Sequence, residues 1–199
     1  ALKSETFRKE LDDAIQDLRA KLTPDYLSQE VAKYQATVQP YVTKEPDSTH
    51  LGLTPSQYEE VAAAIPQEIE SNYQDYLDSL KKPMPFFIGI PEKDENGKLK
   101  VRWDAAYDLK GQKMTYKVEV AKDFEFKDVI HTEEGLTLPE TVLDMPEKGH
   151  YFARVTATNE AGESRDAFDY YVTEAGKHFG VKSFFIQSDG KISEDVYEE

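Results

Sequence analysis

Leu80-Lys81-Lys82-Pro83-Met84-Pro85-Phe86-Phe87-Ile88-Gly89-Ile90 is the segment in which the spacing of the hydrophobic residues changes. Before it, apolar residues recur every three or four positions, as in amphipathic helices. After it they alternate with other residues, as in strands with one buried face. We therefore place a domain boundary at Pro83. The chain is expected to be α+β in two segments, a helical segment at 1–82 and a β segment at 83–199.

The helical segment is expected to begin with two helices. The first has Ser4 or Thr6 as its N-cap, and its single apolar stripe consists of Phe7, Leu11, Ala14, Ile15, Leu18 and Leu22. The second begins at Thr23-Pro24, because threonine is a good N-cap and proline suits the first helical position. We expect Pro40 to end it.

A third helix follows the turn-rich segment from Thr43 to Gly52. Thr54 and Gln57 form a capping box around Pro55, which is typical of a helix start. Pro66 lies inside this helix and predicts a kink or a break near Ile65, since proline lacks the amide proton of the helical ladder. Together these helices are expected to form a helical bundle element.

The β segment is expected to be an antiparallel β-sandwich, because several short alternating runs are separated by turn signals. Asn96-Gly97 is a hairpin-type turn between the first two runs. A further strand at Val181–Gln187 either pairs with an edge strand or packs against the helices. The expected strands are Phe86–Ile90, Leu99–Trp103, Tyr116–Val120, Val129–Thr132, Leu138–Leu143, Tyr151–Thr158 and Ala167–Val172.

Composition excludes several functional classes. The 199 residues include 39 Asp and Glu against 24 Lys and Arg, for a net charge of -15, and no cysteine. An acidic surface repels phosphate backbones and anionic lipids, so nucleic acid is not an expected partner. The absence of cysteine excludes disulfides, thiol nucleophiles and cysteine-ligated metals. No apolar run is long enough to predict membrane insertion.

Motifs for catalysis or cofactor binding are missing from the sequence. The glycines form neither GxGxxG nor GxxxxGK, and no GxSxG elbow is present. Gly176 and Gly180 are interpreted as a flexible hinge before the last strand. The four histidines are separate in sequence and lack the spacing of a helical metal site; they are His50, His131, His150 and His178. We therefore assign no catalytic residue, no cofactor and no metal, and leave the binding residues unknown.

Carboxylates are too abundant to identify a site by themselves. Asp94-Glu95-Asn96-Gly97 lacks the spaced ligands of a calcium loop and is interpreted as a turn. Asp166 and Asp169 beside Tyr170-Tyr171 suggest a sugar-binding face. The competing interpretation is strand alternation, with Phe168, Tyr170 and Val172 pointing inward and Asp169, Tyr171 and Thr173 pointing outward.

Residues 83–173 resemble fibronectin type III domains. Leu99-Lys100-Val101-Arg102-Trp103 is similar to the second strand of that family, with its buried tryptophan, and Met114–Val120 to the third. Met145–Gly162 is similar to the stretch from the tyrosine corner into the sixth strand. The resemblance implies a fibronectin type III or immunoglobulin-like sandwich in which Tyr151 bonds back to the chain. The sequence departs at Met145, where leucine is usual, and at Glu147-Lys148, where Gly-Thr is usual.

The whole chain resembles the C-terminal portion of secreted bacterial proteins of the CotH family, the spore-coat-protein-H-like kinases. The similar segments are Tyr34–Pro46 and Trp103–Asp108 with Tyr116–Phe126; Glu45 replaces the usual aspartate. The resemblance implies that residues 1–82 correspond to the terminal helices of an atypical kinase fold. The ATP and metal sites would then lie upstream, and this fragment would not be an enzyme.

The expected function is a non-catalytic docking or presentation module of an extracellular CotH-like protein at the cell surface or spore coat of a Gram-positive bacterium. The expected partner is a protein or a glycan at that surface. The alternative is a carbohydrate-binding or adhesion module, which requires three or more exposed rings on one face among Trp103, Tyr107, Tyr151, Tyr170 and Tyr171. A divergent enzyme using scattered carboxylates is the third hypothesis, and it needs perturbed pairs in a cleft.

Overall fold

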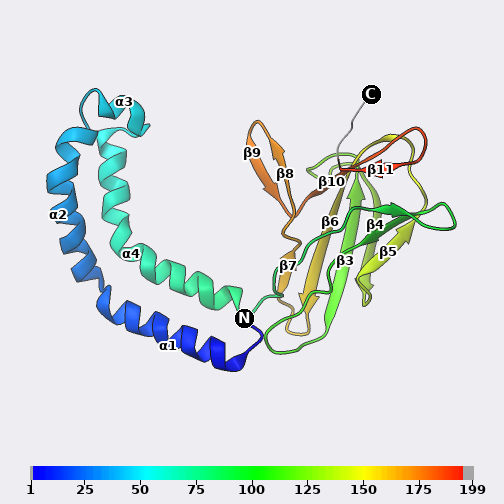
Figure 1. The fold of residues 1–199 in the computed structure, drawn as a ribbon, viewed down its shortest axis with the longest axis horizontal. Helices are drawn as coiled ribbons and strands as arrows, with labels where there is room; N and C mark the ends of the chain where they lie inside the picture. Colours follow the sequence, from blue (N-terminus) through cyan, green and yellow to red (C-terminus); the bar gives the residue numbers. More distant parts are fainter. Residues whose placement is uncertain (1, 195–199) are drawn as a thin grey trace. The chain divides into compact units, whose positions relative to one another are not determined.

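The computed structural model describes residues 2–194. The chain divides into two compact units, Ala1–Ser79 and Leu80–Glu199, and the division lies close to the predicted boundary at Pro83. Within the described residues, unit 1 contains the helices and unit 2 the antiparallel sheets (Figure 1). The fold is therefore α+β with its helices first, and each unit is described by itself.

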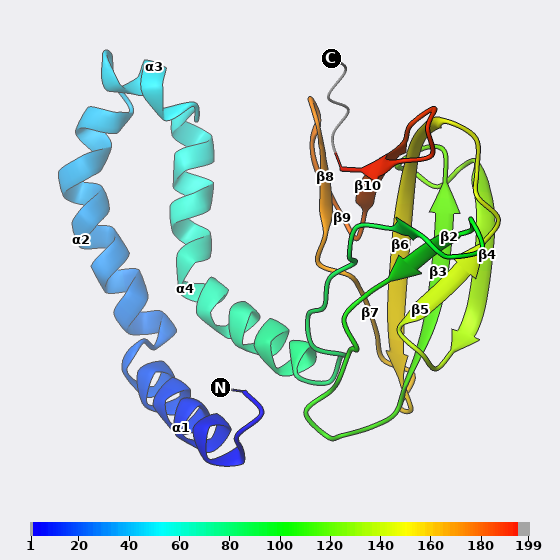
Figure 2. The same ribbon diagram turned by 45° about the vertical axis from the view of Figure 1, so that its right-hand side comes forward.

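Unit 1 consists of three long helices and one short helix. They are α1 (Glu5–Lys21), α2 (Pro24–Val42), α3 (Asp47–Leu51) and α4 (Pro55–Ser79). α4 runs back alongside α2 and α1, so the unit is a helical hairpin (Figures 1 and 2).

Local capping chemistry determines where the long helices begin. The side chain of Ser4 accepts a hydrogen bond from the third residue of α1 at 3.3 Å, and Thr23 does the same for α2 at 3.2 Å, with Pro24 at the first helical position. At α4, Gln57 Oε1 accepts from the Thr54 amide at 2.9 Å, and Thr54 Oγ1 accepts from the Gln57 amide at 3.3 Å. The predicted caps of all three helices are confirmed.

Pro40 does not end its helix as predicted, and Pro66 bends its helix without breaking it. Pro40 does not end α2, which continues to Val42, because the proline lies in the last turn and the amide of Thr43 still bonds to Gln39 O at 3.2 Å. The predicted turn region contains the short helix α3. Pro66 does not break α4, which is continuous over its 25 residues, but the helix bends in its middle as predicted (Figure 2).

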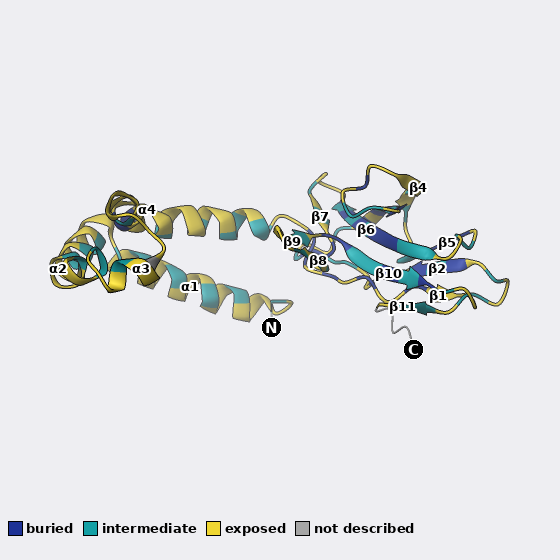
Figure 3. Ribbon diagram, turned by 90° about the horizontal axis from the view of Figure 1, so that it is seen from above, coloured by how far each residue is buried: buried dark blue, intermediate teal, exposed yellow. Residues whose placement is uncertain are grey.

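The helical unit has almost no core, contrary to the prediction of a bundle element. Among its described side chains only Ala62 and Pro66 are buried, and α1 buries none of its apolar stripe. Phe7 and Leu18 of that stripe are exposed. Figure 3 shows the same helices mostly in the exposed and intermediate colours. A hairpin is one helix thick on each side, so each apolar stripe has a single neighbour to cover it.

The described residues of unit 2 form three antiparallel sheets. The strands are β1 (Glu92–Lys93), β2 (Leu99–Arg102), β3 (Met114–Ala121), β4 (Val129–Leu136), β5 (Glu140–Leu143), β6 (Gly149–Asn159), β7 (Ser164–Asp166), β8 (Tyr170–Thr173), β9 (Gly176–Phe179), β10 (Lys182–Ile186) and β11 (Ile192–Ser193). One sheet has the order β1-β2-β5, and the second has the order β11-β10-β6-β3-β4, with β7 also paired to β6. The hairpin β8-β9 forms the third sheet.

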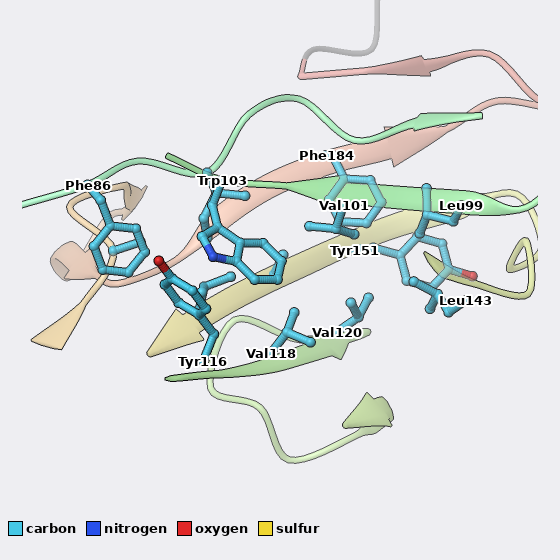
Figure 4. Packing of buried hydrophobic residues seen from close by; sticks show 14 of the residues in the cluster. Phe86, Leu99, Val101, Trp103, Tyr116, Val118, Val120, Leu143, Tyr151 and Phe184 are labelled. Atoms are coloured by element: carbon cyan, nitrogen blue, oxygen red, sulfur yellow. The ribbon is translucent and has the colours of Figure 1, made fainter. Parts of the chain in front are cut away.

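The first two sheets enclose a hydrophobic core, as the sandwich prediction required (Figure 4). Trp103 from the end of β2 packs edge-on against Tyr116 of β3, with ring centroids 5.4 Å apart. Tyr151 of β6 is buried, and its hydroxyl donates to the Glu147 carbonyl at 2.9 Å. The predicted burial of Trp103 and the predicted bond from Tyr151 back to the chain are both confirmed.

The structure corrects one strand prediction and distinguishes between the two alternatives for the tail. The run Phe86–Ile90 forms only a single bridge, between Ile88 and Trp103, although Phe86 and Ile88 are buried and Ile90 is exposed. The predicted hairpin at Asn96-Gly97 connects β1 to β2. Of the two alternatives for the tail, strand pairing is the correct one, because β10 pairs with β6.

The strand predicted at Ala167–Val172 differs most from the structure. β7 and β10 pair with successive parts of the same edge of β6, opposite β3, and β8-β9 is a hairpin inserted between them. Its alternation is the reverse of the predicted one: Phe168, Tyr170 and Val172 are exposed. The reversed facing is caused by contacts with residues far away in the sequence. Asp169 Oδ2 accepts from the Ile88 amide at 2.7 Å, and Tyr171 packs against other rings.

Candidate binding surfaces

An open apolar groove lies between α2 and α4 of the helical unit. We call it the helical groove; its volume is about 210 Å³, and it is lined by Val31, Tyr34, Gln35, Tyr58, Val61, Ala62 and Ile65. The lining residues recur at helical spacing on each helix, so each helix contributes one stripe. Ala62 is buried, whereas Tyr34 is 69% exposed and Val61 is 52% exposed. The groove therefore presents apolar side chains that the unit itself does not cover.

The charges on α4 are all of one sign. The helix contains six carboxylates and neither lysine nor arginine; the carboxylates are Glu59, Glu60, Glu68, Glu70, Asp75 and Asp78. On α2 the single lysine, Lys33, forms an ion pair with Glu30, which raises the pKa of Lys33. The surface around the helical groove is therefore acidic.

The other end of the helical hairpin is held by polar contacts. Gln16 of α1 donates to the Tyr73 hydroxyl at 2.6 Å. The Arg19 guanidinium lies 3.9 Å from the centre of the Tyr73 ring and pairs with Glu70. Hydrogen bonds from Gln74 and then from Arg19 lower the pKa of Glu70. These contacts join α1 to α4 and leave the helical groove open.

A second exposed surface lies in the sandwich unit. We call it the aromatic patch; it consists of Phe87, Phe168, Tyr170, Val172 and Phe179, all of them exposed. The rings form two pairs, Phe87 with Phe168 at 6.3 Å and Tyr170 with Phe179 at 6.0 Å between centroids. Each pair is a local group of exposed rings, and such exposed apolar groups mark interaction surfaces in soluble proteins.

Two histidines lie on the opposite side of the β8-β9 hairpin, among packed rings. His150 stacks on Phe185 at 4.0 Å, and its Nε2 lies 2.7 Å from Ser183 Oγ; burial lowers its pKa. His178 contacts Phe124 at 4.4 Å. Both histidines contribute to the packing beneath the hairpin. Gly176 and Gly180 do not form the predicted hinge, because His178 between them belongs to strand β9.

The remaining histidines lie apart from this cluster. His50 belongs to α3. His131 on β4 lines a cavity of about 400 Å³ with Lys122, Asp144 and Glu147, and its Nε2 is 3.8 Å from Glu133, too far for a hydrogen bond. Within residues 2–194, no three His, Asp or Glu side chains are grouped so as to hold a metal ion. We assign no catalytic role to any of these groups.

The carboxylate motifs have structural positions. Asp94 Oδ1 accepts from the amides of Asn96 and Lys98 at 2.9 and 2.8 Å, so the turn interpretation is correct; the bond from Lys98 is the main cause of the lowered pKa of Asp94. Asp166 Oδ1 accepts from Thr156 Oγ1 at 2.5 Å, while Asp169 is turned inward. They do not form a sugar-binding face with adjacent tyrosines.

The carbohydrate-binding hypothesis requires at least three exposed rings among the five aromatic residues that the sequence suggested, and the structure does not meet this requirement. Trp103 and Tyr151 are buried at 5% and 3% exposure, and Tyr107 and Tyr171 are half-buried. Tyr170 alone among the five is exposed. The phenylalanines of the aromatic patch were missed, because strand alternation does not show which face is turned to solvent.

Comparisons with known proteins give no further assignment. No protein-family model, no curated protein and no solved structure matches the chain. Among the helices of the described part of the chain, none has the length and apolar character needed to cross a membrane.

Proposed function

We propose that this chain is a non-catalytic docking module whose helical unit binds a protein partner. The observation that supports this proposal is the helical groove, in which Tyr34 and Val61 remain exposed beside the buried Ala62. A helical hairpin that buries so little apolar surface within itself gains stability when a partner covers it. The sandwich then presents or positions the helical unit.

The context we propose is an extracellular CotH-like protein of a Gram-positive cell surface or spore coat, with a fibronectin type III-like sandwich. Support comes from the sequence resemblance, from the two facing antiparallel sheets, and from the Tyr151 hydroxyl bond to Glu147. In that context the kinase core belongs to the upstream part of the parent chain, and the present residues dock the parent to its surroundings.

A second candidate function is glycan binding by the sandwich, and the aromatic patch favours it. Four exposed rings in two pairs offer flat apolar faces, and sugar rings stack on such faces. Lys177 Nζ lies 4.2 Å from the centre of the Tyr170 ring and adds a hydrogen-bond donor beside it. A glycan array with the whole chain tests this candidate, with Phe179→Ser as the variant that should lose any signal.

The docking proposal is tested by capture from a cell-surface extract, comparing the whole chain with the double variant Tyr34→Ser, Val61→Ser. We expect the captured protein to be lost with the double variant and retained with Phe179→Ser, which alters the aromatic patch only. Equal capture by all three chains would contradict the proposal. Saturable micromolar binding of Mg-ATP in a calorimetric titration would contradict its non-catalytic part.

A further inference from the structure

We propose that the helical groove binds an amphipathic α-helix with basic flanks, supplied by a different protein. This inference rests on the proposed docking function and names the chemistry of the partner. It combines three features of the helical unit: the shape of the groove, the exposure of its lining and the sign of the surrounding charge.

The shape of the groove fits a third helix. Two antiparallel helices, α2 and α4, form its walls, and the small side chain of Ala62 lies between larger residues. Helices that dock into such grooves insert apolar side chains at i, i+3, i+4 and i+7. The lining of α4 has the matching period, since Tyr58, Val61, Ala62 and Ile65 occupy one face of that helix. A docked helix would complete a three-helix arrangement and provide the core that the hairpin lacks.

The exposure of the lining shows that the helical unit does not cover it. Tyr34 and Val61 are exposed on opposite walls, and Ile65 is exposed next to Val61 on α4. By contrast, the α1 end of the hairpin is occupied by the polar contacts of Arg19 with Tyr73 and Glu70. The groove between α2 and α4 therefore offers open apolar side chains on both of its walls, in addition to the exposed Phe7 and Leu18 of α1.

The negative charge of α4 beside the helical groove favours a partner helix with basic residues. Glu68 follows Val61 by two helical turns, and Glu30 precedes Tyr34 by one, so both carboxylates lie on the same sides of their helices as the exposed lining. α4 has six carboxylates without a basic residue. A second copy of this chain would place an identical acidic row against this one. Lysine or arginine beside the apolar stripe of the incoming helix would instead be attracted to the α4 wall, whereas on the α2 wall Glu30 is paired with Lys33.

The experiment uses synthetic helical peptides as probes and the whole chain as receptor. The first probe has about 20 residues, long enough to follow five helical turns, with leucine at i, i+3, i+4 and i+7 positions and lysine elsewhere. The second has the same composition with leucine and lysine alternating, which removes the helical stripe. The third is the first with glutamate in place of lysine. Binding is followed by fluorescence anisotropy of the labelled peptide.

We expect the first peptide to bind at least about tenfold more tightly than either of the others, a difference that one lost anchor residue would produce. The double variant Tyr34→Ser, Val61→Ser should weaken binding by about tenfold or more. Glu30→Gln with Glu68→Gln should weaken it less and reduce its salt dependence. Phe179→Ser is the control and should leave binding unchanged.

Several results would overturn the inference. They are equal binding of the lysine and glutamate peptides, equal binding of the two lysine peptides, and full binding by the double variant. Sedimentation of the chain as a dimer that the double variant dissociates would identify a second copy as the occupant. If none of the peptides binds while capture from the extract still depends on the groove, the proposed partner chemistry is wrong and the docking function stands. If groove-dependent capture is also absent, both proposals are wrong. Circular dichroism verifies that each variant is folded, and Val61→Thr supplies a milder substitution of similar shape.

Discussion

Replacing each of two adjacent tyrosines by alanine tests the reversed face of the β8-β9 hairpin. Tyr171 lies under the hairpin, with its ring 5.0 Å from Phe152 and 5.6 Å from Phe124. Tyr170 points to solvent and is 50% exposed, with Phe179 at 6.0 Å as its ring neighbour. The two substitutions remove the same atoms from consecutive positions, so a difference in stability reports the facing of the strand.

The expected magnitudes follow from burial. Truncating a fully buried aromatic residue to alanine costs about 3–5 kcal/mol; Tyr171 is half-buried, so we expect Tyr171→Ala to lower the free energy of unfolding by about 2 kcal/mol. Tyr170→Ala removes one exposed ring pair and should cost less than about 1 kcal/mol. In a chain of this size the difference between the variants corresponds to a few degrees in Tm, about 2–4 °C per kcal/mol.

Urea unfolding followed by tryptophan fluorescence measures both values. Trp103 is the single tryptophan of the chain and is buried in the sandwich core, so its emission reports unfolding of the unit that contains the hairpin. Equal costs for the two variants, or a larger cost for Tyr170→Ala, would refute the reversed facing.

Two further predictions concern the same unit. Tyr151→Phe removes the 2.9 Å hydrogen bond to Glu147 O and should lower the free energy of unfolding by about 1 kcal/mol; an unchanged urea midpoint would show that this bond does not contribute. Burial lowers the pKa of His150 from 6.5, so as the pH falls below 6.5 the unfolded chain takes up the proton first and stability decreases. His150→Gln should reduce the decrease in the urea midpoint between about pH 7.5 and about pH 5.5, and an identical decrease in both proteins would contradict this role.

Features that depend on neighbouring residues were predictable from sequence. The caps at Ser4, Thr23 and Thr54 follow from short side chains that reach the amide three residues further along the chain. The turn at Asp94 has the same local origin. The bend at Pro66 follows from the missing amide proton. Each of these structures needs only a few consecutive residues, so remote parts of the chain have little influence on them.

Features that depend on distant partners were not predictable in the same way. The apolar stripe of α1 suggested a bundle, but Leu18 is exposed because no further helix among the described residues of the helical unit covers it. The sequence correctly predicts alternating side chains after Asp166, but it predicts the wrong set as buried: Phe168, Tyr170 and Val172 are exposed. Asp169 bonds to Ile88, a residue far away in the sequence, and this contact turns the neighbouring Tyr170 outward. The aromatic patch therefore escaped prediction.

The sequence alone predicts the order of the elements, helices before strands, and the residue at which each of the three long helices begins. It also determined the acidic character of α4, because charge is a property of composition. Which apolar side chains remain exposed depends on the tertiary structure. Periodicity places Val61 or Tyr170 on one face of an element, but burial depends on whether another element covers that face, and this depends on contacts between residues far apart in the chain.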